Sequence, residues 1–335
     1  MATLRAVIPY MIDEEHKHEG TRAIAEILTL SEHIYAGVEF GRCPDLPIQI
    51  ATIHKKDIPR SPARIAFARG GRAPQGNVRL TLRIPGGADA VRRDYPNLPR
   101  RAIERITANL YTYEFVQRIG DLALALNIAK PGVVHLDSPN LYRNGRFFSQ
   151  DRGYSWIIGE AVAFGRHLGW PPIKELDVSA VWTWLTSLPG FNSGMVPGRI
   201  GRALSAVTFL IRSSPSDASP GDFVWALLAL EALYCVGGQG SKQQLMDKSA
   251  VFLGQRPTGS KKFAQMYDYR SRFVHGDIDF PHAYLDTMDD KMGDFLGDAS
   301  DCWCTATSLL IATLQRLCES GMSDLQFEYS LKELG

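Results

Sequence analysis

The sequence holds few cysteines and no long hydrophobic run, and each of these absences excludes a class of protein. Its five cysteines are an odd number without paired spacing, which argues against a disulfide framework and favours a reducing compartment. The longest apolar stretch, "VWALLALEALYCV", contains Glu231 and is shorter than the roughly 18 residues that a membrane span needs. The opening segment lacks the apolar core of a secretory signal. We therefore expect a soluble, cytoplasmic protein with no membrane association.

Motifs for metals and cofactors are missing as well. The chain has no zinc-ligand spacing, phosphate-binding glycine loop or nucleophile elbow. His16 and His18 lie among glutamates and could bind a divalent ion, but charge-rich segments near a terminus are usually just solvated. Cys302 and Cys304, two apart on an expected helix, point to opposite sides and are expected to be buried or incidental thiols. The sequence predicts no cofactor and no metal site.

The net charge of +1 conceals a strong asymmetry. Between Lys55 and Arg101, twelve basic residues accompany three aspartates, a local net charge of +9. This basic segment could face a polyanion, although few aromatic residues are interleaved with its arginines, so base stacking is not expected there. Eight aspartates between Asp277 and Asp301 supply the compensating charge. The two segments could also face each other.

The first part of the chain mixes helical and strand-like patterns. Apolar alternation predicts strands at 48–54, 63–70 and 78–85, after a helix over 21–37. Helical periodicity then runs over Arg101–Lys130 and stops before Pro131 and Gly132. The remaining expected elements of this part are short strands within 132–137 and 145–150 and helices over 154–169 and 176–188.

The composition changes after Leu188. Residues 189–198 form a linker rich in glycine and proline, and helical segments alternate with breaker loops beyond it. These helices are expected at Arg199–Ile211, Asp222–Val236, Ser241–Leu253, Lys261–His275 and about Ala299–Glu319. The sequence thus predicts an α+β fold, with a mixed N-terminal domain over 1–188 and an all-α bundle over 197–335.

One basic residue occupies an apolar position in the segment "FAQMYDYRSRFVHGD". At helical spacing an apolar stripe is formed by Phe263, Met266, Tyr267 and Val274, and Arg270 falls on the same stripe. His275 directly precedes Gly276, a natural helix-ending residue, and so lies at the negative end of the helix dipole. One interpretation is structural: His275 caps the dipole and Arg270 extends its charged end to solvent.

Glu231 suggests a second interpretation. It is the only acidic residue inside a helix that is apolar nearly all round, and a buried carboxylate requires a cationic partner. Arg270 is the obvious candidate. Such an ion pair would either fix the bundle or orient the guanidinium toward a functional site.

These residues resemble the HEPN helical domain, specifically its Apea-like branch. The branch signature is an arginine and a histidine separated by four to six residues near the end of a late helix, matched here by Arg270 and His275 in "YDYRSRFVHGD". The segment "WALLALEALY" is similar to the second helix of that branch, with Glu231 in the acidic position. The resemblance covers Pro197–Glu319. Many nucleases of the family carry Asn, Asp or His directly after the arginine, whereas this chain has Ser271.

The resemblance implies metal-independent endoribonuclease activity in a toxin-like or antiviral defence effector. Arg270, His275 and Glu231 would be the catalytic residues, because His275 can transfer protons near neutral pH and Arg270 can hold phosphate oxygens. One histidine is short of the two proton-transfer roles, and the family's homodimers bring two such motifs into one cleft. We therefore expect a homodimer formed through the bundle, with RNA as the substrate.

Other roles follow from the same expectation. Ser271 and Arg272 are candidate substrate-binding residues beside the motif, and Arg60, Arg64, Arg69 and Arg72 are candidates for phosphate contacts within the basic segment. The N-terminal domain is expected to engage substrate or an unknown trigger, either a ligand or a protein. The acidic stretch from Asp277 to Asp301 could dock on the basic segment and hold the enzyme inactive. The alternative function is a non-catalytic dimerisation or regulatory binding module.

Overall fold

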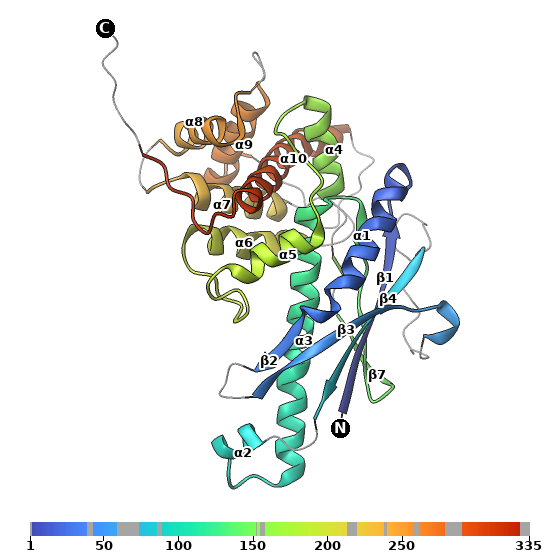
Figure 1. Ribbon diagram of the computed structural model, residues 1–335. Helices are drawn as coiled ribbons and strands as arrows, with labels where there is room; N and C mark the ends of the chain where they lie inside the picture. The colour runs from blue at the N-terminus through green and yellow to red at the C-terminus, as the bar shows by residue number, and fades with distance from the viewer. Residues whose placement is uncertain are drawn as a thin grey trace. The chain divides into compact units, whose positions relative to one another are not determined.

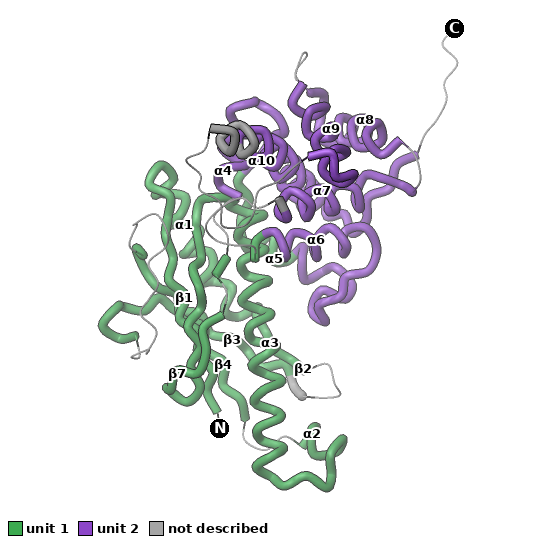
Figure 2. The backbone as a smooth tube through the Cα atoms, turned by 180° about the vertical axis from the view of Figure 1, so that it is seen from behind, with its two compact units in different colours: residues 1–157, 175–183, 211–217 green, residues 158–174, 184–210, 218–335 purple. Residues whose placement is uncertain are grey.

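Two compact units make up the chain (Figure 2). The computed structural model describes residues 2–38, 43–58, 74–85, 89–151, 153–154, 158–212, 220–237, 240–256, 261–278 and 290–328. Unit 1 comprises Met1–Ile157, Glu175–Thr183 and Ile211–Asp217, and unit 2 comprises Ile158–Lys174, Trp184–Leu210 and Ala218–Gly335. The division into domains over 1–188 and 197–335 that the sequence predicts stays a prediction.

Unit 1 is built on an antiparallel sheet (Figure 1). Within the described residues the strand order is β2-β3-β4-β1-β6-β7, and β5 also pairs with β1. The sheet and the helices that follow it confirm the predicted α+β fold. The strands are β1 (Ala2–Ile12), β2 (Tyr35–Val38), β3 (Cys43–Thr52), β4 (Gly76–Ile84), β5 (Val134–Leu136), β6 (Asn140–Arg143) and β7 (Arg146–Gln150).

The sheet is apolar on one face and more polar on the other. Leu4 pairs with Leu82, and Ala6 pairs with Leu80, and all four side chains are buried. The alternate residues Arg79 and Arg83 of β4 belong to the other face, where exposure is greater. This one-sided pattern is typical of an antiparallel sheet with one face on a core.

The central strand β1 was absent from the expected elements, whereas β4 was predicted over 78–85. Ala6 to Ile8 is buried on both faces, so this part of β1 lacks the clean alternation that marks a half-buried strand. The helix expected over 21–37 is wrong at its end, because the structure forms β2 (Tyr35–Val38) by pairing with β3. The expected strand at 63–70 lies outside the described residues.

The helices of unit 1 are α1 (Lys17–Thr29), α2 (Asp89–Asp94), α3 (Arg100–Ala129) and the first part of α5 (Val178–Ser187). Two long helices, α1 and α3, contact the sheet, and the short α2 contacts α3. α3 has 30 residues, which corresponds to a length of about 45 Å. α1 contacts β1, β3 and β5, and α3 contacts β2, β4 and β5. Gly132, at φ 77°, follows the end of α3 and agrees with the predicted stop.

Unit 2 is helical in its described residues. It contains α4 (Ile158–Leu168), α6 (Gly198–Ile211, ending at Leu210 within the unit), α7 (Pro220–Tyr234), α8 (Ser241–Leu253), α9 (Lys262–His275) and α10 (Asp290–Glu319), with the last residues of α5. α10 contacts α4, α7, α8 and α9 and is buried through its C-terminal half.

The predicted bounds of α8 are confirmed, whereas α10 begins nine residues before the expected Ala299. Among the described residues, no helix is long and apolar enough to cross a membrane.

A buried charge cluster lies on α3. The Arg118 side chain is only 3% exposed, and its guanidinium bonds Glu114 Oε1 and Asp121 Oδ2, each at 2.7 Å. Burial raises the pKa of Asp121 to about 7; Arg118 opposes this, and the neighbouring charge of Glu114 adds to it. One arginine shared between two carboxylates cannot keep both ionised at low cost.

The shifted pKa makes stability depend on pH. The folded pKa of Asp121 lies above the ordinary value of about 4, so the folded chain binds the extra proton between these two pH values. The free energy of unfolding should therefore fall as pH rises from about 4 to about 7 and level off above, with a total Asp121 contribution of up to about 4 kcal/mol. Asp121→Asn should remove this component, as measured by urea unfolding at a series of pH values. Parallel pH profiles for the two proteins would show that Asp121 keeps an ordinary pKa.

Candidate functional site

The site predicted from the motif centres on Glu231 of α7. α7 is apolar over most of its surface, and Ala226, Ala229, Leu230 and Leu233 are buried. The Glu231 side chain is 20% exposed, so its carboxylate is largely withdrawn from water. A carboxylate in this setting is stable only with donors around it.

Two residues of α9 supply those donors. Arg270 Nη2 lies 3.0 Å from Glu231 Oε1 and donates to Oε2 at 3.3 Å. The Tyr267 hydroxyl donates to Oε1 at 3.0 Å, and the guanidinium carbon lies 5.7 Å from the Tyr267 ring centroid. The expected ion pair between Glu231 and Arg270 is confirmed. It explains why an arginine occupies the apolar stripe of this helix.

The geometry leaves most of the guanidinium available. Nη2 alone contacts Glu231, whereas Nη1 and Nε make no hydrogen bond to any other residue that the structure describes. The Arg270 side chain is 27% exposed. A planar guanidinium held by one nitrogen can offer the others to an anion in a fixed direction.

The groups around Glu231 stay neutral. Burial and, to a smaller extent, the charge of Glu231 together raise the pKa of Tyr267 to about 12, so the hydroxyl remains a donor at physiological pH. Burial and the same carboxylate raise the pKa of Cys235, which follows α7. The charges at the centre of the site are therefore those of Glu231 and Arg270.

Packing along α9 holds Arg270 in place. Phe263, Met266 and Tyr267 are buried, as the apolar stripe predicted. The Tyr269 ring meets Phe223 of α7 edge-on, with ring centroids 5.4 Å apart. Near the start of α9 the ammonium of Lys262 pairs with the carboxylate of Asp301.

The last turn of α9 differs from the prediction. Val274 was expected on the buried stripe, but its side chain is 56% exposed, so this part of the prediction is wrong. Its neighbours Ser271, Arg272 and His275 are exposed as well. The apolar face of α9 thus ends before its last turn, which presents polar groups to solvent.

His275 closes the helix as the sequence predicted. Gly276 adopts φ 77°, its N–H donates to Phe273 O at 3.3 Å, and the N–H of Asp277 donates to Arg272 O at 2.8 Å. These two bonds form the helix-ending motif that requires a left-handed residue after the last turn. His275 therefore lies at the C-terminal, negative end of the α9 dipole.

Arg270 and His275 do not contact each other. Five positions on an α-helix correspond to a rotation of about 140°, so the two side chains leave α9 in different directions. The His275 side chain makes no hydrogen bond or ion pair within the described part of the chain. The structure joins Arg270 to Glu231 but leaves His275 separate.

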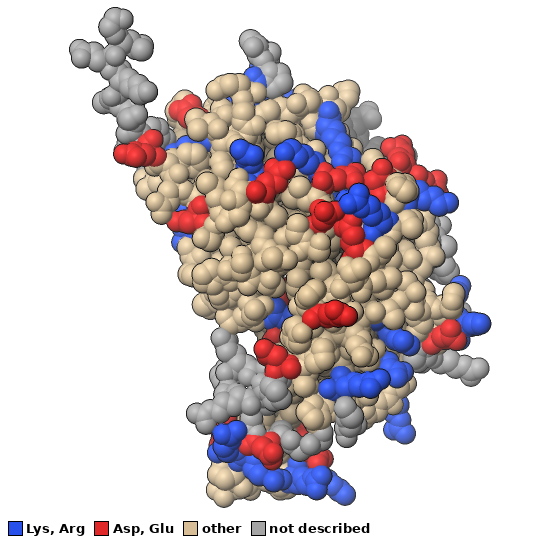
Figure 3. Space-filling view, in the orientation of Figure 1, with Lys and Arg blue, Asp and Glu red and all other residues tan. Residues whose placement is uncertain are grey.

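The basic segment is described only in part. Arg60, Arg64, Arg69 and Arg72 lie outside the described residues, so their expected role in RNA binding stays a prediction, as does docking of the acidic stretch. Other arginines of the segment belong to α2 and the start of α3, where Lys and Arg side chains gather in Figure 3. Arg92, Arg93 and Arg101 are exposed there.

The remaining candidate groups are thiols and metal ligands. Cys302 and Cys304 are buried in α10, as predicted, and burial raises the pKa of each to about 12. The described residues contain no group of three or more His, Cys, Asp or Glu side chains that could hold a metal ion.

Comparison with known proteins adds no relative. No family model, no curated protein and no solved structure matches the chain. Membership of the HEPN family therefore stays an expectation drawn from the motif. A second arginine site on unit 1, formed by Arg143 and α3, was not predicted from the sequence, because its residues come from distant parts of the chain.

Removing either member of the ion pair should destabilise unit 2. Glu231→Gln and Arg270→Gln should each lower the free energy of unfolding by about 1–2 kcal/mol, because each leaves a partly buried charge without its partner. The double variant should lose less than the sum of the two, with a coupling of about 1 kcal/mol measured by urea unfolding. Arg272→Gln, which removes an exposed arginine from the same helix, should change stability by less than about 0.5 kcal/mol. Additive losses would show that the two side chains do not interact in solution.

Proposed function

We propose that the chain is a metal-independent endoribonuclease in which Arg270 binds the scissile phosphate and His275 transfers a proton. The observation that carries this proposal is the contact of Arg270 with Glu231 through a single nitrogen. That contact fixes the guanidinium while leaving its other donors for phosphate oxygens. The exposed His275 at the end of the same helix supports it.

The reaction needs few groups. The ribose 2′-hydroxyl attacks the adjacent phosphorus, a base accepts its proton, and the 5′-oxygen leaves with a proton from an acid. The products are a 2′,3′-cyclic phosphate and a 5′-hydroxyl. Histidine is suited to either proton transfer near neutral pH, and a fixed guanidinium stabilises the additional negative charge of the phosphorane.

The direction of the side chains favours a site shared by two chains. A single chain directs Arg270 and His275 differently along α9 and supplies one histidine for two proton transfers. An apolar patch on α6 and α7 offers a surface for a second copy: Phe209 and Trp225 stack with centroids 4.4 Å apart, and Phe209 and Leu228 are 55% and 46% exposed. Leu228 lies three residues before Glu231, on a neighbouring position of the same helix. We propose a homodimer through this patch, with Arg270 of one chain near His275 of its partner.

The same patch favours the alternative function. An exposed apolar surface also fits a regulatory module that only dimerises. The two functions differ in whether His275 is required. The proposed setting is the cytoplasm, as a toxin-like or antiviral effector with an unknown trigger, following the resemblance to the family.

The nuclease is tested by incubating end-labelled RNA with purified protein in excess EDTA. Wild type should cleave and leave cyclic phosphate and 5′-hydroxyl ends, identified by phosphatase and kinase treatment. His275→Ala should reduce the rate at least a hundredfold, because proton transfer contributes roughly 10²–10⁴-fold. Arg270→Lys, which keeps the charge but not the planar fork, should also reduce it strongly.

The control is His167→Ala, which removes another histidine of unit 2 and should leave the rate unchanged. Equal cleavage by wild type and His275→Ala would contradict the proposal. A folded, dimeric wild type that does not cut RNA would favour the binding module.

The dimer is tested by changing the apolar patch. Leu228→Glu should produce a monomer in sedimentation equilibrium, because burying a carboxylate in an apolar interface is costly, and cleavage should fall with it. Val251→Glu is the control, because Val251 of α8 is 75% exposed and lies outside the patch. A wild type that is monomeric at micromolar concentration yet fully active would exclude the shared site.

A further inference from the structure

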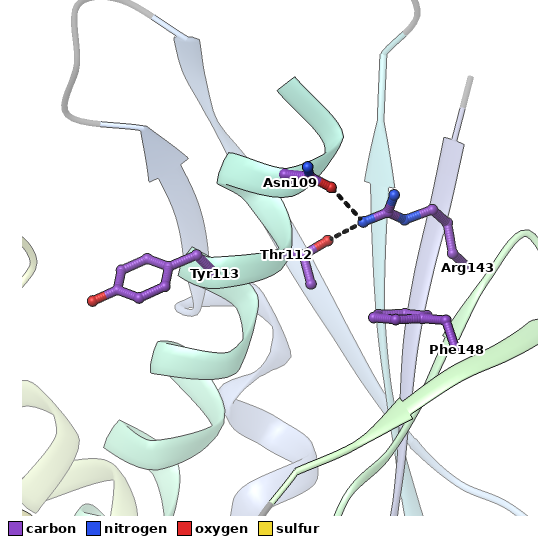
Figure 4. Close-up of a pocket in the computed structure, with 5 residues that line it drawn as sticks. All are labelled: Asn109, Thr112, Tyr113, Arg143 and Phe148. Atoms are coloured by element: carbon purple, nitrogen blue, oxygen red, sulfur yellow. Dashed lines mark hydrogen bonds between the residues drawn. The ribbon is translucent and has the colours of Figure 1, made fainter. Parts of the chain in front are cut away.

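A cavity on unit 1 lies between α3 and the hairpin of β6 and β7. It has a volume of about 480 Å³ and is lined by Asn109, Thr112 and Tyr113 of α3, Arg143 of β6 and Phe148 of β7. Figure 4 shows Asn109 and Thr112 turned toward Arg143, whose guanidinium lies above the Phe148 ring, while Tyr113 points away from them. The volume falls in the range of small-ligand sites, roughly 300–1,000 Å³.

The Arg143 side chain is held on two sides. Its Nη2 donates to Thr112 Oγ1 at 2.8 Å and to Asn109 Oδ1 at 3.2 Å. Its guanidinium carbon lies 5.2 Å from the Phe148 ring centroid. The side chain therefore reaches the cavity in a defined orientation, with Nη1 making no hydrogen bond to the described residues.

The Arg143 guanidinium is ordered by neutral groups and not by a carboxylate. Within the described residues, carboxylates pair with Arg22, Arg100, Arg118, Arg212 and Arg270. Arg143 instead donates to two neutral oxygen atoms, and its buried Nε has no hydrogen-bond partner among the residues that the structure describes. A fixed guanidinium without a carboxylate is prepared to bind an external anion.

The surroundings of the cavity are basic. Arg101, Arg105 and Asn109 follow one another at four-residue spacing on α3, so they lie along one face of the helix. Arg146 of β7 is directly opposite Arg143 in the strand register. Arg101, Arg105 and Arg146 are exposed. Several phosphates in a row would suit this arrangement better than one.

Two exposed aromatic rings complete the site. The Phe148 and Tyr113 side chains are 42% and 75% exposed, and they lie on different sides of Thr112 (Figure 4). Exposed rings beside arginines are the means by which proteins hold unstacked bases.

We infer that this cavity binds single-stranded RNA, with one phosphate on Arg143, the strand following Arg105 and Arg101, and bases against Phe148 and Tyr113. The inference deepens the proposed function by assigning a place where unit 1 holds the substrate. It rests on that function only for the choice of RNA as the strand.

The test is binding of a fluorescent, fully 2′-O-methylated RNA 12-mer to the full chain, measured by anisotropy. This RNA cannot be cleaved through its 2′-hydroxyls, so loss of binding is distinguished from loss of cleavage. Arg143→Gln should weaken binding at least tenfold and reduce the dependence of log K on log salt by about 0.7. Arg202→Gln, which removes an exposed arginine from unit 2, should change affinity less than twofold.

Arg143 also links β6 to α3, so Arg143→Gln could weaken binding by disturbing the fold. A second variant distinguishes this effect from the loss of a direct contact with RNA. Phe148→Leu removes the flat ring but not the Arg143 hydrogen bonds, and should weaken binding three- to tenfold with unchanged thermal unfolding. Wild-type affinity for both variants, or no binding by wild type, would overturn the inference. Competition by AMP at the same concentration as the 12-mer would make the cavity a mononucleotide site and would also overturn it.

Discussion

A guanidinium withdrawn from water must find acceptors, and this requirement organises the charged interior of the protein. Arg118 is nearly buried and takes two carboxylates from its own helix. Arg270 takes one carboxylate from another helix and keeps part of its donor set. Arg143 donates to two neutral oxygen atoms, so its positive charge is not neutralised by these acceptors. A guanidinium stays protonated at physiological pH, so each N–H group without an acceptor in the protein remains a donor for an external anion. The three arginines therefore differ in how many donors they still offer.

The sequence was sufficient to predict the pair of Glu231 and Arg270. One carboxylate in an apolar helix and one arginine on an apolar stripe each present an unfavourable burial, and pairing relieves both. The same local patterns predicted α8 and α9 to within one residue, because helical periodicity and end signals lie inside the segment. Val274 shows the limit of this reasoning: periodicity gives the face of a helix but not where its neighbours end.

The Arg143 site could not be predicted in the same way. Asn109 and Thr112 are more than thirty positions from Arg143, and their meeting depends on the placement of α3 beside the hairpin of β6 and β7. Strand β1, which joins β4 and β6 in register, was not recognised because its middle is buried on both faces. Without that strand the sheet order is unknown, and no spacing along the chain reveals which side chains face the same cavity.

The two arginine sites also differ in their electrostatics, which bears on how a nuclease of this kind would work. Glu231 neutralises Arg270, so that pair adds little net attraction for a polyanion and acts through the direction of its remaining N–H groups. Strong binding at such a site would slow product release without stabilising the phosphorane, since interactions equal in ground and transition states do not raise the rate. The uncompensated charge of Arg143 and the arginine row on α3 are suited to the opposite task, which is long-range attraction and weakly selective retention of a strand. Under the proposed function, unit 1 would supply affinity for RNA and unit 2 would supply orientation, and salt should weaken retention of RNA far more than the chemical step on RNA already bound.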